Sequence, residues 1–421
     1  MTTSAMPTEQ PQVTRSGRLW RNRSYMLLWS GQAISTIGTE ISTVAFPLLA
    51  LLVTNSPVQA GLMGATRALP YLFFSLPAGA LVDRWDRKRV MILCDTGRVI
   101  AMGSIPIALA LNHLSVAQLY IVSALEGSLF VFFNIAEVAC LPRVVSKEQL
   151  PAATAQNAAT DGTAALVGPA LGGALFGLHA LLPFVADAIS YTVSVVTLFF
   201  IPARFQGERK AENRRSLRKE IAEGLAWLWH QPLIRFIAVL TGVTNIPGLV
   251  LIIIVVAQEQ MHASSLVVGL IFTIGGIGGI IGAAIAPWVQ KRARFATVII
   301  SMMWLWTLLF PLYALAPNPV WLGIVVATAF VSSPVYNVVQ MSYRLALIPD
   351  ELQGRVNSVF RLIAFAGQPI GLAITGLLLE AFNPLVTVLA FMALQAFVSI
   401  LATVNSHVRN AKPLAEVEAT A

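Results

Sequence analysis

The sequence predicts an all-α membrane protein with twelve transmembrane helices in two six-helix pseudo-repeats. Of its 421 residues, 56% are hydrophobic and only 11% are charged, whereas a soluble domain is about a quarter charged. The apolar residues form twelve stretches of roughly the 20 residues that a membrane-spanning helix needs. Between these stretches, lysine and arginine occur only in alternate connections. These patterns exclude a soluble globular protein.

Polar turns and prolines such as Pro57, Pro317 and Pro384 separate the expected spans. The segment before the first span, residues 1–24, lacks the apolar core and cleavage site of a signal peptide, so we expect a cytoplasmic tail. The expected spans cover residues 25–52, 60–82, 89–111, 116–140, 151–177, 181–201, 234–257, 265–288, 296–316, 320–346, 355–379 and 384–404.

The basic residues predict the orientation of the chain in the membrane. One side carries 24 of the 28 lysines and arginines, and the opposite connections carry none. Because short cytoplasmic loops are rich in these residues, both termini are expected in the cytoplasm, which requires an even number of spans. The connections without Lys or Arg are 53–59, 112–115, 178–180, 258–264, 317–319 and 380–383.

One polar stretch, residues 203–231, divides the chain. Leu217, Ile221, Leu225 and Leu228 recur there at helical spacing, which predicts an amphipathic helix on the cytoplasmic membrane surface. The halves on either side are weak repeats of each other. The expected divisions are a tail (1–24), an N-terminal bundle (25–202), the linker (203–231), a C-terminal bundle (232–405) and a second tail (406–421).

No sequence pattern points to a cofactor or a metal. The chain lacks the Gly-x-x-x-x-Gly-Lys-Ser/Thr loop that binds nucleotide phosphates, and its five histidines are scattered. Cys94 and Cys140 fall in or at expected helices, so we expect core residues rather than a disulfide. The positive charge is gathered on one side of the membrane, which argues against a nucleic-acid partner.

The turn between the second and third spans carries the most specific signal. Residues 77–90 read PAGALVDRWDRKRV, with six charges in seven consecutive residues. This order resembles the loop signature of the major facilitator superfamily, although Asp86 stands where that signature has glycine. The resemblance implies that Asp83 closes an inner gate against the start of the eleventh span, near Gly354. The residues expected at this gate are Gly79, Asp83, Arg84, Arg87, Lys88, Asp95 and Arg98.

A second motif lies in the fifth span, where residues 168–173 read GPALGG. It resembles the Gly-Pro-x-x-Gly-Gly block of facilitator antiporters, which implies export rather than uptake. Small residues let helix backbones approach closely, so we expect a helix contact here. The motif residues are Gly168, Pro169, Gly172 and Gly173, and the expected partner is the eighth span with Gly275, Gly276, Gly278, Gly279 and Gly282.

Charged residues within spans are costly and are therefore candidates for function. Acids outnumber arginines six to three there, a balance that favours protons or cationic substrates over anions. Asp95 and Arg98 are three residues apart and can pair on one helix face. Glu137 and Asp187 lie nearer to span ends, from which they can reach the interface. The complete set is Glu40, Asp95, Glu126, Glu137, Asp161 and Asp187, with Arg67, Arg98 and Arg361.

We expect one of three acids to carry a coupling proton, with Glu126 first, Asp161 second and Glu40 third. All three lie near the middle of a span, where desolvation disfavours the charged form of a carboxyl group. The alternative for each is a satisfied internal hydrogen bond or a pair with arginine. The polar residues expected with them in a proton-coupling or substrate cavity are Asn245, Asn337 and Gln340.

Further segments resemble one branch of the superfamily, the macrolide-efflux and enterobactin-exporter group. The resemblance implies a facilitator that exports a small amphipathic or hydrophobic compound, such as a drug, siderophore or metabolite, by alternating access in exchange for protons. We expect a monomer in the cytoplasmic membrane, in contact with lipids, and not an enzyme. An uptake symporter of the same fold and a non-transporting membrane enzyme or sensor remain as alternatives. The segments are 28–32, 45–48, 78–84, 187–190 and 223–228.

Overall fold

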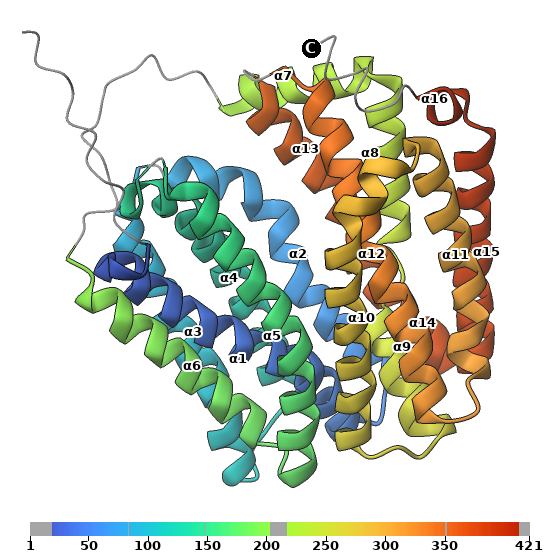
Figure 1. Cartoon of the computed structure of the whole chain (residues 1–421). Coiled ribbons are helices and arrows are strands. Elements are labelled where there is room, and N and C mark those ends of the chain that lie inside the picture. Colours follow the sequence, from blue (N-terminus) through green and yellow to red (C-terminus); the bar gives the residue numbers. More distant parts are fainter. Residues whose placement is uncertain (1–18, 83, 147, 203–216, 350–351, 412–421) are drawn as a thin grey trace, which may run out of the picture.

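A computed structural model of the chain describes residues 19–82, 84–146, 148–202, 217–349 and 352–411. The regular elements of these residues are all helices, in two bundles that lie side by side (Figure 1). The first bundle, or N half, contains α1 (Arg23–Thr54), α2 (Pro57–Val82), α3 (Arg87–Ala110), α4 (Val116–Val144), α5 (Leu150–Leu178) and α6 (Leu182–Phe200).

The second bundle, or C half, follows a surface helix, α7 (Leu217–His230). Its helices are α8 (Pro232–Thr244), α9 (Leu249–Val255) with a π-helical turn (Val256–Gln260), α10 (Ser265–Arg292), α11 (Phe295–Leu315), α12 (Pro319–Leu347), α13 (Gln353–Ala366), α14 (Gln368–Ala381), α15 (Pro384–Val404) and the short α16 (Ser406–Arg409).

Eleven helical segments among the described residues are long and apolar enough to cross a membrane. The remaining expected span, 60–82, corresponds to the 26-residue helix α2, which is not among those eleven. The all-helical membrane fold is therefore confirmed, and the count of twelve crossings stays a prediction.

Two expected spans, 234–257 and 355–379, are each broken into two helices. The breaks fall beside Pro247 and Pro369, since proline cannot donate the helical hydrogen bond and clashes with the preceding turn. The two breaks pack against each other: Asn245 Nδ2 donates to the Ala364 carbonyl at 3.0 Å, and the Gly248 amide donates to Thr375 Oγ1 at 3.0 Å. Polar groups that the breaks expose are thus satisfied inside the C half.

Several helices begin at a side chain that accepts a hydrogen bond from the first turn. Asp86 is one of these caps, because its Oδ1 accepts from the Arg89 amide at 3.0 Å at the start of α3. Capping gives a physical reason for an aspartate at the position where the facilitator signature has glycine. The other side-chain caps of the long helices are Asn22, Ser115, Asn318 and Asn383.

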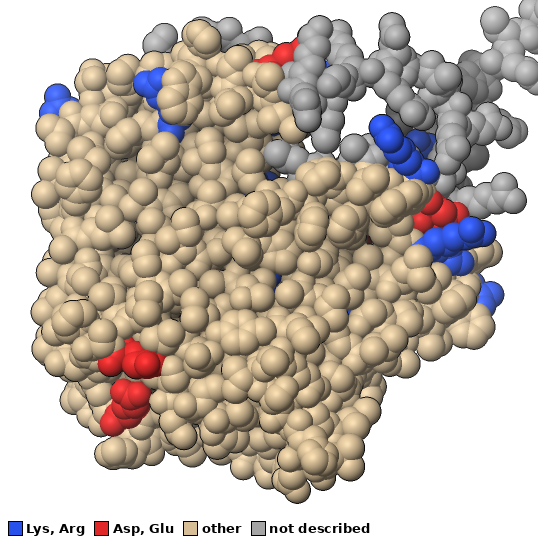
Figure 2. Space-filling model, turned by 180° about the vertical axis from the view of Figure 1, so that it is seen from behind, with Lys and Arg blue, Asp and Glu red and all other residues tan. Residues whose placement is uncertain are grey.

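We call the end of the molecule that carries α7 and α16 the basic end, and the other end the outer end. The arginine and lysine side chains of one face gather toward the basic end, and a wide uncharged band covers the middle (Figure 2). The surface helix α7 is tied to the C half, since Arg355 Nη1 lies 2.6 Å from Glu223 Oε2. The first part of the expected linker, residues 203–216, lies outside the described residues.

Among the described residues, the buried apolar side chains form three clusters, and their membership shows how the halves meet. One cluster, toward the outer end, draws on both halves and contains Val44, Phe184, Leu251 and Val268. The other two, toward the basic end, each belong to a single half. Apolar packing therefore joins the halves at the outer end and leaves them separate at the basic end. Cys94 and Cys140 belong to the cluster of the N half, as expected for core residues.

Candidate functional site

The first contact between the halves is the crossing of α5 and α10. A methyl group at Gly173 would lie 2.7 Å from the Gly269 Cα, and one at Gly276 would lie 2.7 Å from the Leu166 Cα. Gly172 instead faces its own half, where a methyl group would lie 2.6 Å from the Ile41 carbonyl oxygen. The packing of the fifth span on the eighth is therefore confirmed, and the glycine block holds α5 against α1 and α10 at once. Of the expected glycines of α10 only Gly276 faces α5, because Gly275, Gly278 and Gly282 pack on α12 instead.

The second contact is the crossing of α2 and α14, which the sequence did not point to. A methyl group at Gly61 would lie 3.0 Å from the Gly376 Cα. Beside this crossing the Glu380 carboxylate accepts hydrogen bonds from the Ser56 hydroxyl and from the Val58 amide, the latter at 3.0 Å. A carboxylate is favoured there because the first turn of a helix leaves N–H groups unsatisfied. Both crossings lie toward the outer end.

At the basic end the glycines on the two sides of the expected gate have open space beside them. A methyl group at Gly79 in α2 or at Gly354 in α13 would have no described atom within 4 Å. Asp83, the expected gate acid, lies outside the described residues. Arg87 Nη1 donates to the Ala139 carbonyl at 2.8 Å and Lys88 Nζ donates to the Ile201 carbonyl at 2.7 Å, while Arg84 is exposed. The basic turn is thus anchored on carbonyls near the ends of α4 and α6.

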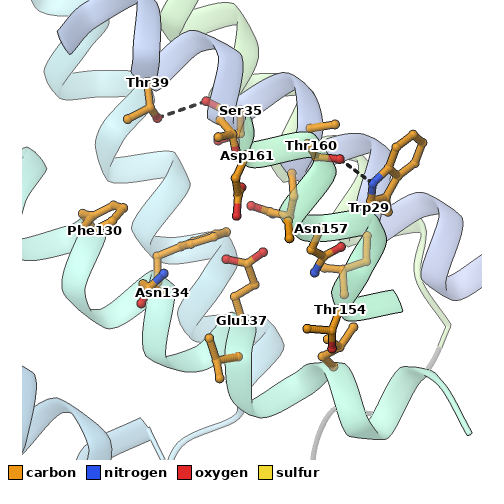
Figure 3. Close-up of a pocket in the computed structure, with 18 of the residues that line it drawn as sticks. Trp29, Ser35, Thr39, Phe130, Asn134, Glu137, Thr154, Asn157, Thr160 and Asp161 are labelled. Atoms are coloured by element: carbon orange, nitrogen blue, oxygen red, sulfur yellow. Dashed lines mark hydrogen bonds between the residues drawn. The ribbon is translucent and has the colours of Figure 1, made fainter. Parts of the chain in front are cut away.

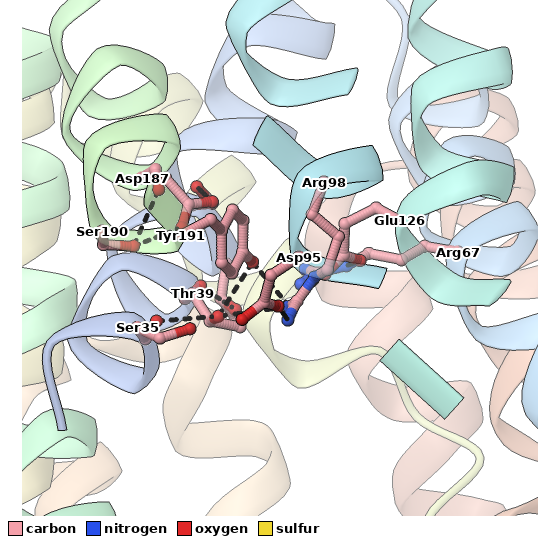
Figure 4. A network of polar contacts seen from close by, with 11 residues as sticks. Ser35, Thr39, Arg67, Asp95, Arg98, Glu126, Asp187, Ser190 and Tyr191 are labelled. Carbon is pink, nitrogen blue, oxygen red and sulfur yellow. Dashed lines mark hydrogen bonds and ion pairs between the residues drawn. The ribbon is translucent and has the colours of Figure 1, made fainter. Parts of the chain in front are cut away.

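A buried charged network crosses the N half at mid-depth (Figure 4). Arg98 is its centre, with Nη1 at 3.4 Å from Asp95 Oδ1 and Nη2 at 2.9 Å from Glu126 Oε1. The Tyr191 hydroxyl lies 2.6 Å from Nη2, and the Arg98 guanidinium lies 3.9 Å from the centre of the Tyr191 ring. The other carboxylate oxygen of Glu126 is paired with Arg67 of α2. The Asp95–Arg98 pair was expected, whereas no pattern in the sequence pointed to Tyr191.

This network gives Glu126 the arginine partners that the sequence left open as an alternative to proton transfer. Both carboxylate oxygens are bound by guanidinium groups, and the residue is only 2% exposed. Asp187 is also fully buried, where it accepts hydrogen bonds from the hydroxyls of Ser42 and Ser190. The expectation that Asp187 reaches the interface is therefore wrong, because α6 turns this side chain toward α1.

A cavity of about 600 Å³ lies within the N half, between α1, α4 and α5 (Figure 3). We call it the acidic cavity because three carboxyl groups, those of Glu40, Glu137 and Asp161, line it. The Glu137 and Asp161 side chains point toward each other across it (Figure 3). In the described part of the chain none of the three acids forms an ion pair. Sequence reasoning assigned Glu137 to a span end and missed it, since only the placement of α4 opposite α5 across the cavity turns it toward Asp161.

A second cavity, of about 470 Å³, lies between the two halves and is called here the central cavity. Helices α1, α2 and α4 line it from one side, and α9, α13 and α14 from the other. Thr39 and Phe130 border both cavities, and the charged network separates them, with Arg98 on the acidic side and Arg67 and Glu126 on the central side.

Three expected cavity residues line neither of these cavities. Asn245 is held in the C half by its bond to the Ala364 carbonyl. Asn337 donates to Ser333 Oγ at 3.5 Å on its own helix, and Gln340 is 5% exposed within α12. Helix α12 packs mainly on α10 and α11, which removes it from the central cavity.

Two helical halves that meet at one end and enclose a cavity between them define a membrane transporter. The chain belongs to the major facilitator superfamily, whose family model matches residues 28–372. It is therefore a multi-pass protein of the cell membrane that carries small molecules, and not an enzyme.

Relatives and solved structures agree with this assignment. The chain is 26% identical to the multidrug efflux pump Tap of Mycolicibacterium fortuitum over 84% of this chain and 88% of the pump. It is also 26% identical to macrolide efflux protein A of Streptococcus pyogenes, over 85% of this chain and 89% of that protein. Among solved structures, the nucleoside transporter NupG has a TM-score of 0.72 at 13% identity, with 92% of this chain and 100% of that chain covered.

A bacterial homologue of the iron transporter ferroportin is similar in two states. Its inward-facing structure has a TM-score of 0.68 at 16% identity and covers 91% of this chain and 98% of that one. Its outward-facing structure with soaked iron has a TM-score of 0.56, with 90% of this chain and 99% of that one covered. At these identities the likeness shows the fold alone.

Proposed function

We propose that this protein exports small amphipathic molecules from the cytoplasm in exchange for protons. The observation that carries the proposal is the pair of adjoining cavities. An apolar cavity between the halves suits the substrate, and a cavity with three carboxyl groups beside it suits the proton. The export direction is supported by the Gly-Pro-x-x-Gly-Gly block and by relatives whose names describe efflux pumps.

The orientation and the state of the transporter follow from charge and packing. The basic end belongs in the cytoplasm because short cytoplasmic loops are rich in Lys and Arg. The halves are then joined at the outer end and separate at the cytoplasmic end, which is the inward-facing state. The higher TM-score with the inward-facing ferroportin homologue supports the same state.

The coupling acids of this proposal are Glu137, Asp161 and Glu40. They face a common cavity without an ion-pair partner among the described residues, whereas Glu126 is bound by two arginines. Close carboxyl groups in a poorly solvated site cannot all be charged at once, so such a site holds protons. The Arg98–Glu126–Arg67 network would transmit a change of charge from the acidic cavity to the central cavity.

Everted membrane vesicles with an acidic interior test the proposal. Three probes are offered, namely neutral chloramphenicol, anionic pyrenebutyrate and cationic ethidium. The wild-type protein should accumulate at least one of them, and a protonophore should abolish the accumulation. A variant combining Glu40→Gln, Glu137→Gln and Asp161→Asn should lose this pH-driven transport while retaining probe binding.

The matched control is Glu259→Gln, which removes an exposed carboxylate at the outer end of the C half. This variant should transport as the wild type does. Accumulation that ignores the protonophore, or that persists in the triple variant, would contradict proton coupling. Accumulation only in right-side-out vesicles would favour the uptake symporter.

A further inference from the structure

The central cavity has aromatic and aliphatic walls and few polar groups. Phe46, Met63 and Phe130 line it from the N half, and Leu251 and Phe365 line it from the C half. Tyr71 and Phe365 meet edge to face across the halves, with ring centres 6.1 Å apart. Such walls bind a flat apolar body through area contact and aromatic packing.

In the part of the chain that the structure describes, the charged side chains of this cavity are two arginines and one glutamate. The glutamate, Glu126, has both oxygens occupied by Arg67 and Arg98. That leaves Arg361, which lies in the middle of α13, is exposed to the cavity and has no hydrogen bond or ion pair with any described residue. A charged side chain within a membrane span is costly without a partner, which marks this position as functional.

Apart from Glu126, the acids that favoured cationic substrates in the sequence do not line the central cavity. Glu40, Glu137 and Asp161 line the acidic cavity, on the far side of the Arg98–Glu126 pair. The structure thus places these three acids and Arg361 in different cavities, which a count of charges in the sequence could not reveal. The cavity between the halves is left with an excess of positive charge.

We propose that the central cavity recognises amphipathic carboxylates, with the carboxylate bound by Arg361 and the apolar body against the aromatic walls. The proposal rests on the proposed function, because it takes the central cavity as the substrate site. A guanidinium binds a carboxylate through two parallel hydrogen bonds. A ligand with a neutral amide in place of the carboxylate cannot form this pair, and a ligand with an ammonium group is repelled by the positive charge. Gln368, which borders the same cavity, offers a further hydrogen-bond donor.

Three pyrene probes that differ only in their polar group test this inference. They are pyrenebutyrate, its neutral amide and the corresponding amine, each titrated against purified protein in dodecyl maltoside. Binding is followed by energy transfer from tryptophan to pyrene. A hydrogen-bonded ion pair contributes about 1.5–3 kcal/mol, so the acid should bind at least about tenfold more tightly than the amide. The amine should bind most weakly.

Variants test whether Arg361 is the source of the preference for the acid over the amide. Arg361→Gln should reduce acid affinity to that of the amide and leave amide affinity unchanged, which shows that the cavity is intact. Arg361→Lys should keep part of the preference, since lysine retains the charge without the planar fork. The matched control is Arg235→Gln, which removes an arginine of α8 that donates to the Trp229 carbonyl and lies outside both cavities. Gly64→Phe, which fills the central cavity, should abolish binding of all three probes.

Several results would overturn the inference. They are equal binding of acid and amide by the wild type, tighter binding of the amine, an acid preference that survives Arg361→Gln, and probe binding that survives Gly64→Phe. The vesicle experiment decides the proposed function separately, because pH-driven accumulation of chloramphenicol or ethidium would support export even where the carboxylate preference fails.

Discussion

Within the N half, Arg98 forms one ion pair inside its own helix, with Asp95, and one between helices, with Glu126. The Asp95–Arg98 pair was predictable because both residues lie on one helix face, three positions apart. The partners of Glu126 were not, since Arg98 and Arg67 come from α3 and α2 and their meeting depends on how these helices pack. The same limit hid Glu137, whose neighbour Asp161 belongs to α5.

The Glu126 pairing leads to a stability prediction. Glu126→Gln would leave the buried Arg98 guanidinium and the half-buried Arg67 guanidinium without their shared carboxylate. Breaking a buried ion pair from one side costs about 3–5 kcal/mol, and the loss falls mainly on Arg98. We expect a lower midpoint of thermal unfolding, measured by tryptophan fluorescence of the detergent-purified protein. Adding Arg67→Gln removes one of the stranded charges and should recover part of the loss.

The double variant is thus the internal control for Glu126. If the double variant loses as much stability as the sum of the two single variants, the two residues do not interact and the network contributes little. The same follows if Glu126→Gln is as stable as the wild type. Loss of pH-driven transport in a stable Glu126→Gln variant would instead return Glu126 to its place as first coupling acid.

At the scale of helices, the sequence placed most spans within a few residues but did not foresee the breaks. Pro169 in α5 and Pro369 in the eleventh span each lie close to glycines, yet α5 is continuous and the eleventh span is divided. The difference lies in tertiary contacts. A methyl group at Gly371 would meet the Ile246 carbonyl, so the break is stabilised by the opposing break of the seventh span.

The α5–α10 crossing gives a prediction with a close control on the same helix. A methyl group at Gly173 meets the backbone of α10, 2.7 Å from the Gly269 Cα, whereas one at Gly162 would have no described atom within 4 Å. Backbone cannot rotate away as a side chain can. Gly173→Ala should therefore force the halves apart at the outer end, and Gly162→Ala should not.

Spin labels at Leu178 and Val320 report this change, because both positions are well exposed at the outer end of opposite halves. Double electron–electron resonance should show a longer distance between the labels in Gly173→Ala than in the wild type. Equal distances in Gly173→Ala and Gly162→Ala would mean that the crossing does not hold the outer end closed.

For the whole molecule, the division into two halves and the position of the basic end were predictable. The first follows from the spacing of apolar stretches and the second from the distribution of lysine and arginine. The conformational state was not predictable, since a transporter sequence must stabilise two arrangements of its halves and carries the contacts of both. The described contacts belong to one of them, with the outer end closed at two glycine crossings. The second crossing carries the Ser56–Glu380 contact, which joins the halves outside the cavities.

Glu380 should accordingly bias the equilibrium between the two states. Its carboxylate binds the first turn of α2 only while the outer end is closed, and a ligand or contact shifts an equilibrium by its preference for one state. Glu380→Gln keeps the size but removes the charge favoured at a helix N-terminus, so we expect the outer-open population to rise about two- to fivefold. Labels at Arg89 and Lys291, exposed at the basic end of opposite halves, should then gain a shorter-distance component. Glu259→Gln, an exposed acid at the same outer end, should leave the distance distribution unchanged. An unchanged distribution in Glu380→Gln would show that the glycine crossings alone hold the outer end closed.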